Sequence, residues 1–242
     1  MRQEIFKVIS NKEIAKDRYE LKLYGNTEGI VPGQFVEIKV DGFFLRRPFS
    51  VCDAENNELT VVYHASGEGT KAMTCVRSGA EADVLTQLGN GYDMESAGEL
   101  PLLISGGTGL TPVFFLAKTL KKQGKNVKVV MGFASSDEVF YYDELKALGV
   151  DTVLYTVDGS AGEKGLVTDA MNASAYTQIY SCGPFPMLKA IAQKAETDAQ
   201  FSMEARMCCG IGACVGCTID TVNGAKRVCK DGPVFKAKEL KW

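Results

Sequence analysis

Long apolar runs are missing from this chain of 242 residues, and no stretch approaches the ~20 apolar residues that span a membrane. Residues 1–20 are charged throughout and contain no apolar core of a secretory signal peptide. The net charge of −3 at pH 7 also gives no reason to expect a nucleic-acid partner. From these absences we expect a cytoplasmic protein that binds neither membranes nor nucleic acids.

Groups for acid–base or nucleophilic catalysis are scarce as well. His64 is the single histidine, and the chain shows neither a Ser/His/Asp set nor a pair of acid–base carboxylates. A lone histidine on a strand is more often a packed or surface residue than a catalyst, so we do not assign His64 as a general base. We therefore predict no catalytic side chain and look for bound cofactors instead.

Cysteine, in contrast, is abundant: of eight cysteines, four lie within EARMCCGIGACVGC, residues 204–217. A disulfide framework is not expected, because a chain of this length buries a sizeable core without cross-links and the expected compartment is reducing. Clustered cysteines in that compartment are more often metal ligands or catalytic thiols. Four cysteines lack ligand spacing and are interpreted as buried small residues or free thiols: Cys52, Cys75, Cys182 and Cys208.

The other four cysteines follow the ligand order of plant-type 2Fe-2S proteins, C-x4-C-x2-C and then a distant cysteine: Cys209, Cys214, Cys217 and Cys229. Intervening glycines let the backbone wrap closely around a cluster. Four thiolates would also suit zinc, but structural zinc sites usually pair two short C-x2–4-C segments across a spacer. We therefore predict a 2Fe-2S cluster. Cys208 is left out because a ligand there would lengthen the first gap to five residues.

Since a cluster carries one electron at a time, the rest of the chain should hold a second redox cofactor. Residues 1–97 alternate apolar and polar side chains between turn residues, which predicts an antiparallel β-barrel. Within it, Arg47, Phe49 and Ser50 match R-x-[YF]-S around Pro48. The arginine suits a pyrophosphate, the aromatic ring a flat cofactor ring, and the hydroxyl a ring nitrogen. Alone, the pattern fits equally a solvated arginine beside a core phenylalanine.

Two further segments of the barrel belong to this predicted flavin site. Val62, Tyr63 and His64 are expected to form a strand that contacts the flavin. Gly69 and Thr70 are expected to open a short helix whose N-terminus suits phosphate.

Beyond residue 98 the pattern changes to buried strand, glycine-rich turn, helix and strand, which predicts a parallel α/β domain. The turn is GGTGLTP, and the expected helix is VFFLAKTLKKQG. Backbone in such a turn can approach a dinucleotide pyrophosphate, although a plain tight turn would look similar. A CGP segment opens a later helix at the carboxyl edge of the sheet. The predicted nucleotide contacts are Gly106, Gly107, Thr108, Gly109, Cys182, Gly183 and Pro184.

Coenzyme choice is expected to depend on residues 132–145, after the second strand of this domain. A 2′-phosphate calls for a cation there, commonly arginine, but the segment contains no lysine or arginine. It offers instead Asp137, Glu138, Asp143 and Glu144, so NAD is predicted over NADP. Ser135 and Ser136 could still bind a phosphate by hydrogen bonds.

Taken together, these segments resemble the ferredoxin-NADP reductase superfamily. With CGIGACVGC and CKDGPVF near the end, the whole chain is similar to the electron-transfer subunits of NAD-dependent type B dihydroorotate dehydrogenases. The resemblance implies a flavin and iron–sulfur oxidoreductase of three parts: a FAD-binding barrel at 1–97, a NAD-binding α/β domain at 98–200 and a 2Fe-2S module at 201–242. It departs from the family where Phe49 replaces a common tyrosine and Cys208 a usual glycine.

The resemblance also implies partners and a role in pyrimidine biosynthesis. Electrons would pass from an FMN-containing catalytic subunit through the 2Fe-2S cluster and FAD to NAD+, in a heterotetramer of two plus two chains. The cysteine loop would then lie at the subunit interface, with Ile211 and Val215 in contact. Two alternatives stay open: a related subunit of a sulfhydrogenase or ferredoxin-NADP transhydrogenase, and a zinc-binding adaptor without enzymatic activity.

Overall fold

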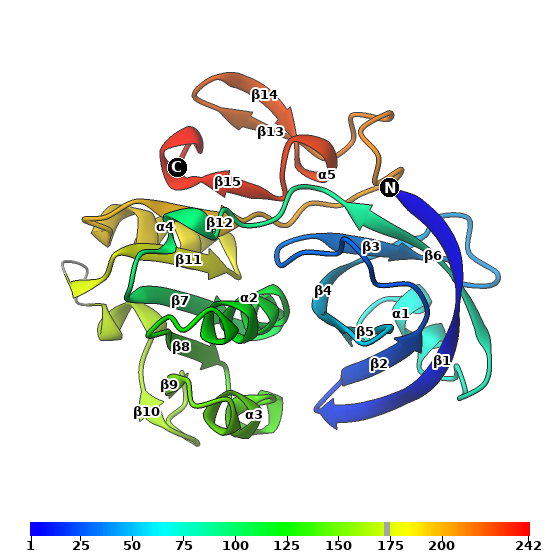
Figure 1. Ribbon diagram of the computed structural model, residues 1–242, viewed down its shortest axis with the longest axis horizontal. Helices are drawn as coiled ribbons and strands as arrows, with labels where there is room; N and C mark the ends of the chain where they lie inside the picture. The colour runs from blue at the N-terminus through cyan, green and yellow to red at the C-terminus, as the bar shows by residue number, and fades with distance from the viewer. Residues whose placement is uncertain (172–174) are drawn as a thin grey trace.

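The structure, a computed structural model, describes residues 1–171 and 175–242. Figure 1 shows a barrel beside an open sheet, with the C-terminal segment lying across the top of both. The barrel wall is formed in order by β1 (Arg2–Ala15), β2 (Arg18–Tyr24), β5 (Glu58–His64), β4 (Arg47–Glu55), β3 (Phe35–Ile38) and β6 (Glu81–Leu88). Side chains of β6 alternate between the interior and the surface, because a strand presents successive residues to opposite faces. Val36, Leu59 and Val61 fill the interior, and the predicted barrel is confirmed.

The open sheet is the predicted α/β layer. Its order is β10 (Glu163–Lys164), β9 (Asp151–Thr156), β8 (Lys128–Phe133), β7 (Pro101–Gly106), β11 (Gln178–Cys182), β12 (Ala199–Ser202) and β15 (Val234–Lys236). Neighbouring strands are parallel from β10 to β12, and β15 is antiparallel to β12. Parallel strands covered on both faces are apolar throughout, as Leu102, Leu103 and Ile104 of β7 illustrate.

Helices cover both faces of this sheet. On one face α2 (Leu110–Lys122) and α3 (Tyr142–Ala147) share a core with Leu103, while on the other α4 (Phe185–Lys194) packs with Leu102. The remaining elements are α1 (Glu68–Met73), the hairpin β13 (Thr218–Thr221) and β14 (Gly224–Arg227), α5 (Val228–Asp231), and 3-10 turns at Glu95–Ala97, Gly107–Gly109, Ser136–Glu138, Val167–Ala170 and Ala237–Glu239. None of the helices in the described ranges is both long and apolar enough to span a membrane.

Helix α2 begins earlier than the sequence predicted. The expected start was Val113, after the turn GGTGLTP, but the helix begins at Leu110 and includes Pro112. Proline is tolerated in the first turn of a helix, where its missing N–H would have no intrahelical partner. The glycine turn is therefore shorter, and Thr111 belongs to the helix rather than to the loop.

The C-terminal segment is continuous with the open sheet. The expected boundary between residues 200 and 201 falls inside β12, and β15 pairs with β12 so that Phe235 lies opposite Phe201. The cysteine-rich segment is thereby tied to the edge of the α/β layer. The division into 1–97, 98–200 and 201–242 as separate domains stays a prediction.

Candidate functional site

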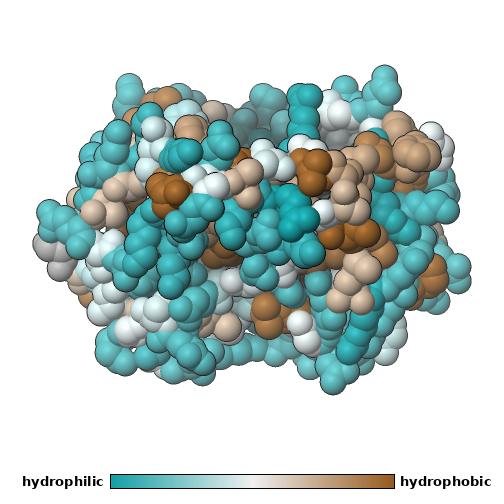
Figure 2. Space-filling model, turned by 90° about the horizontal axis from the view of Figure 1, so that it is seen from above, coloured by the Kyte–Doolittle hydropathy of each residue, from teal (hydrophilic) through white to brown (hydrophobic). Residues whose placement is uncertain are grey.

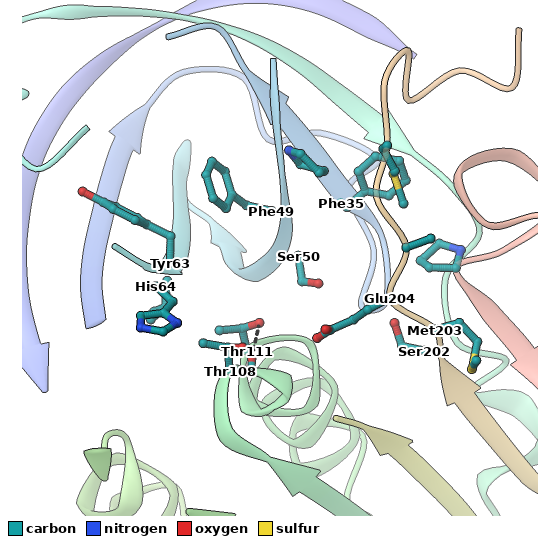
Figure 3. Close-up of a pocket in the computed structure, with 15 residues that line it drawn as sticks. Phe35, Phe49, Ser50, Tyr63, His64, Thr108, Thr111, Ser202, Met203 and Glu204 are labelled. Atoms are coloured by element: carbon teal, nitrogen blue, oxygen red, sulfur yellow. Dashed lines mark hydrogen bonds between the residues drawn. The ribbon is translucent and has the colours of Figure 1, made fainter. Parts of the chain in front are cut away.

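Three segments predicted to bind cofactors meet at a cavity between barrel, sheet and C-terminal segment. We call it the central cavity; its volume is about 250 Å3. Figure 3 shows its side chains converging from β4, β5, the start of α2 and the segment after β12. It is lined by Phe35, Pro48, Phe49, Ser50, Val62, Tyr63, His64, Thr108, Thr111, Ser202, Met203, Glu204, Ala205, Met207 and Pro233.

Aromatic side chains give the barrel side of this cavity a firm wall. The rings of Phe49 and Tyr63 are 5.7 Å apart and tilted, and the Tyr63 hydroxyl donates a hydrogen bond to Asn11 Oδ1 at 3.0 Å. Burial raises the pKa of Tyr63 to about 12, so its hydroxyl keeps its proton. Burial, together with nearby Arg18, lowers the pKa of His64.

Sequence analysis missed Thr111, Ser202 and Glu204 in the central cavity. Figure 3 shows the carboxyl group of Glu204 directed toward the start of α2, where the Thr111 hydroxyl donates to the carbonyl of Thr108 at 3.0 Å. Burial raises the pKa of the Glu204 carboxyl group. The only sequence signal for Glu204 was its place shortly before the cysteine loop.

A second cavity, the arginine cleft, lies further along the same strands. It is lined by Phe43, Arg47, Ser66, Gly67, Glu68, Gly69 and Thr70. The Arg47 guanidinium lies over the Phe43 ring and donates to the carbonyl of Leu45. Among the described residues no carboxylate forms an ion pair with Arg47, which leaves its fork suited to a phosphate. The central cavity, with its aromatic wall, suits the flat ring of FAD, and the arginine cleft suits its phosphates.

A third cavity, the sheet-edge cavity, follows the carboxyl ends of β7, β8 and β9 and measures about 450 Å3. It is lined by Gly106, Gly107, Gly132, Phe133, Ala134, Glu138, Val157, Gly165, Leu166, Val167, Thr168, Pro184, Pro186, Met187 and Ala190. Parallel α/β folds bind nucleotides at this edge. The predicted Gly106, Gly107 and Pro184 thus share one cavity, whereas Thr108 lines the central cavity.

The remaining predicted nucleotide residues lie behind these cavities. A Cβ on Gly109 would come within 2.3 Å of the Cys182 carbonyl oxygen, so only glycine allows the turn to pack against β11. Gly183 is also in close contact, with Gly106. Burial raises the pKa of the Cys182 thiol, and its side chain is enclosed in the core. These residues shape the site through the backbone.

The four predicted ligand cysteines form two pairs. The Cys214 amide donates to the sulfur of Cys209 at 3.4 Å, and the Cys229 amide donates to the sulfur of Cys217 at 3.4 Å. Two thiolates on each of two irons is the arrangement that a 2Fe-2S cluster needs. The pairs therefore fit a two-iron cluster.

Backbone groups in this loop are arranged for thiolates. Burial alone would raise the pKa of Cys209, but N–H groups of Cys214, Ile211 and Ala213 donate to its sulfur and lower the pKa to about 6. Burial and the neighbouring Cys217 raise the pKa of Cys229 to about 12, so a bound cation would have to displace its proton. Cys208 is exposed at the loop's edge.

The cluster loop and the central cavity are joined by a short length of chain. Ala205 and Met207 line the cavity, and the first ligand, Cys209, follows two residues later. On its barrel side the loop rests on Glu37, because a Cβ on Gly210 would lie 2.4 Å from that carboxyl group. The three predicted sites are therefore neighbours, in the order cysteine loop, central cavity and sheet-edge cavity.

Two named relatives show which protein family the chain belongs to. The chain is 43% identical, over 99% of each chain, to the electron transfer subunit of dihydroorotate dehydrogenase B (NAD(+)) from Fusobacterium nucleatum. It is 44% identical, over 99% of this chain and 98% of the relative, to the same subunit from Bacillus pumilus. The chain belongs to this family of electron transfer subunits.

Domain matches and solved structures agree with that family. Residues 204–241 match the iron-sulfur cluster binding domain of dihydroorotate dehydrogenase B, and residues 103–193 match the oxidoreductase NAD-binding domain. An NADH-dependent reduced ferredoxin-NADP oxidoreductase aligns over 98% of this chain and 90% of its own, with a TM-score of 0.88 and 28% identity. Phthalate dioxygenase reductase, at 20% identity and a TM-score of 0.63, shares the fold.

The predicted oxidoreductase and its cofactor set of FAD, a 2Fe-2S cluster and NAD are confirmed for an electron transfer subunit of dihydroorotate dehydrogenase B. The alternative of a sulfhydrogenase or transhydrogenase subunit is not favoured, because the full-length relatives at 43% and 44% identity are subunits of the dehydrogenase. Which individual residues bind each cofactor stays a prediction, now supported by their placement in the three sites.

Proposed function

We propose that this chain carries electrons from a separate FMN-containing subunit, which oxidises dihydroorotate to orotate, through its 2Fe-2S cluster and FAD to NAD+. The single observation that carries the proposal is the continuity of the sites. Segment 202–207 forms one wall of the central cavity and leads directly into the cysteine loop. The opposite wall contains Thr108, in the turn that also borders the sheet-edge cavity through Gly107.

Each site contributes residues suited to one cofactor. Cys209, Cys214, Cys217 and Cys229 hold the cluster. Ser50 and the ring of Phe49 orient a flavin in the central cavity, while Arg47 binds its pyrophosphate in the arginine cleft. FAD, when bound, exchanges the two electrons of a nicotinamide for the single electrons of a cluster. The sheet-edge cavity holds the dinucleotide next to the flavin.

The partner is expected to cover the cysteine loop, because electrons must enter there. Ile211 and Val215 in this loop are 44% and 60% exposed, and Val222 of the following hairpin is 58% exposed. Figure 2 views the molecule from the side on which the C-terminal segment lies, and apolar groups interrupt its hydrophilic surface. Exposed apolar side chains grouped around a redox centre suit a protein interface.

Assembly and location complete the proposal. The family name implies a catalytic partner, and a heterotetramer of two plus two chains would bring each cluster to one FMN subunit. We place the complex in the cytoplasm, where it serves pyrimidine biosynthesis.

Assays on the isolated chain test this division of labour. We expect the purified holoprotein to oxidise NADH with an artificial dye as acceptor, because the route from nicotinamide to FAD lies within the chain. It should not oxidise dihydroorotate, because the cluster, FAD and NAD account for the three sites and the proposal assigns dihydroorotate to the FMN subunit. Adding the FMN subunit should restore that activity. Dihydroorotate oxidation by the isolated chain would overturn the proposed division.

A further inference from the structure

Glu37 of β3 is a buried acidic residue on the face of the barrel that the C-terminal segment covers (Figure 1). Val36 and Ile38 fill the barrel interior, whereas Phe35 packs in the core that the C-terminal segment shares. Because side chains alternate along a strand, Glu37 points outward with Phe35, toward that segment. It is 1% exposed, so the segment encloses a carboxyl group completely.

The carboxyl group lies directly against the cysteine loop. A Cβ on Gly210 would lie 2.4 Å from Cδ of Glu37 and 2.5 and 2.7 Å from its two oxygens. Gly210 also has a φ of +61°, which a residue with a side chain rarely adopts. Only glycine therefore lets the loop approach the carboxyl group this closely, and Gly210 directly follows the first predicted ligand, Cys209.

No other group in the described part of the chain compensates this carboxyl group. Oε1 of Glu37 is buried and has no hydrogen-bond partner there, and none of the ion pairs among those residues includes Glu37. Arg46 is engaged elsewhere, because its Nη2 lies 2.8 Å from Oδ2 of Asp83 and its Nη1 donates to the Asp83 carbonyl at 2.9 Å. A buried carboxylate without a partner is costly, so its place beneath the loop calls for a role.

Cations contact the same loop at a different glycine. Arg227 Nη1 donates to the carbonyl of Gly212 at 2.9 Å, and the guanidinium also pairs with Asp231 at 3.2 Å. A Cβ on Gly212 would lie 2.6 Å from Cδ of Lys230. The loop thus meets positive side chains at Gly212 and a carboxyl group at Gly210.

A carboxylate in this place would oppose reduction of a cluster. Burial and, second, the nearby Cys209 raise the pKa of Glu37, and Arg46 opposes that rise. The carboxyl group and the first ligand are therefore near enough to interact. A reduced cluster carries one more negative charge than an oxidised cluster, and a buried negative charge beside it disfavours that state. Solvent ions screen such a buried interaction little.

We propose that Glu37 sets the reduction potential of the cluster. Its carboxylate holds the potential below the value that the loop alone would give, which makes the reduced cluster a stronger electron donor to FAD. The role is electrostatic: Glu37 ligates no iron and exchanges neither an electron nor a proton. This inference rests on the proposed function, which places a 2Fe-2S cluster on the four cysteines.

Redox titration of the isolated holoprotein, followed by electron paramagnetic resonance of the cluster, tests this role without an activity assay. The titration is run anaerobically at about pH 8, well above the usual range of a carboxyl group. Glu37→Gln keeps the shape of the side chain and removes its charge. Reduction of the cluster should become about tenfold more favourable, which is a midpoint potential about 59 mV more positive. Glu37→Asp keeps the charge and should shift the potential less.

Glu58→Gln is the matched control, because Glu58 lies on β5, which β4 separates from β3, and pairs with Lys22 at 3.2 Å. It should leave the potential unchanged. Equal potentials in the wild type and in iron-replete Glu37→Gln would overturn the role of Glu37, as would an equal shift in Glu58→Gln. Loss of the cluster from Glu37→Gln would show a role in assembly instead and would also refute the proposal. A folded wild type that binds no iron would overturn the proposed cluster site itself.

Discussion

The amide of Cys214 donates a hydrogen bond to the sulfur of Cys209 across the glycine-rich loop, at 3.4 Å. Cys229 and Cys217 repeat this relationship from separate segments, one in α5 and one before β13. The two pairs match the two thiolates that each iron of a 2Fe-2S cluster takes.

The ligand assignment predicts which cysteines hold iron. Replacing any one of the four pairing cysteines by serine should reduce iron to a small fraction of the wild-type content, because a hydroxyl is a poor substitute for thiolate on iron. Cys208→Ser should leave the iron content near normal. Iron per chain after anaerobic purification measures both. Loss of iron in Cys208→Ser, with retention in Cys209→Ser, would show that the first ligand is Cys208.

Two adjacent arginines give a test of the FAD site. Arg47→Ala should raise the dissociation constant for FAD about 10–100-fold, the range expected when a charge-assisted hydrogen bond to phosphate is lost. Arg46 is the control, because it points away to Asp83, whose carboxylate lies 2.8 Å from its Nη2. Flavin fluorescence during titration of the apoprotein reports the constant. Equal losses in Arg46→Ala and Arg47→Ala would contradict the assignment.

If the partner covers the cysteine loop at Ile211 and Val215, a substitution there should impair assembly and nothing else. Ile211→Asp should weaken association with the FMN subunit tenfold or more, a rough value for a charge buried in an interface. FAD binding and NADH dye reduction should survive, since they depend on the other two sites. Ile5→Asp, at an exposed position of the barrel strand β1, is the matched control. Assembly is measured by size-exclusion chromatography with the partner. If both variants assembled like the wild type, the proposed interface at the cysteine loop would be contradicted.

The barrel and the α/β layer are held together by a cross-layer ion pair. Lys118 of α2 pairs with Asp53 of β4, and their side chains are 17% and 23% exposed. Lys118→Met should lower stability by about 2 kcal/mol, which corresponds to a melting temperature roughly 4–8 °C lower. Lys125→Met removes a pair with the largely exposed Glu99 and should change the melting temperature little. Differential scanning fluorimetry of the two holoproteins compares them, and equal melting temperatures would contradict a stabilising role for this contact.

Short sequence segments were enough to predict parts of the candidate site. Ligand spacing in the cysteine loop and the glycine turn at Gly106 and Gly107 are properties of short segments, and both were expected from the sequence. The place of Glu204 in the central cavity and the contact between Arg18 and Glu138 were not expected. Each brings together segments that lie far apart in the chain. No short pattern encodes such a contact.

The start of α2 shows a different limit. The glycine-rich pattern predicted a turn through Pro112, but a proline is compatible both with a turn and with the first turn of a helix. Packing of Leu110 in the core beside the sheet decides between them. Similarly, the pairing of β15 with β12 depends on Phe235 and Phe201 meeting across the sheet edge, which composition does not reveal.

The most direct measurement is the reduction of NAD+ by dihydroorotate in a mixture of the purified FMN subunit and this chain. We predict that NADH forms only when both proteins are present, and that the Cys214→Ser variant, matched for FAD content, fails to support it because electrons must pass through the cluster. NADH formation by the FMN subunit alone, or at the full rate with Cys214→Ser lacking iron, would contradict the route from cluster to FAD to NAD+.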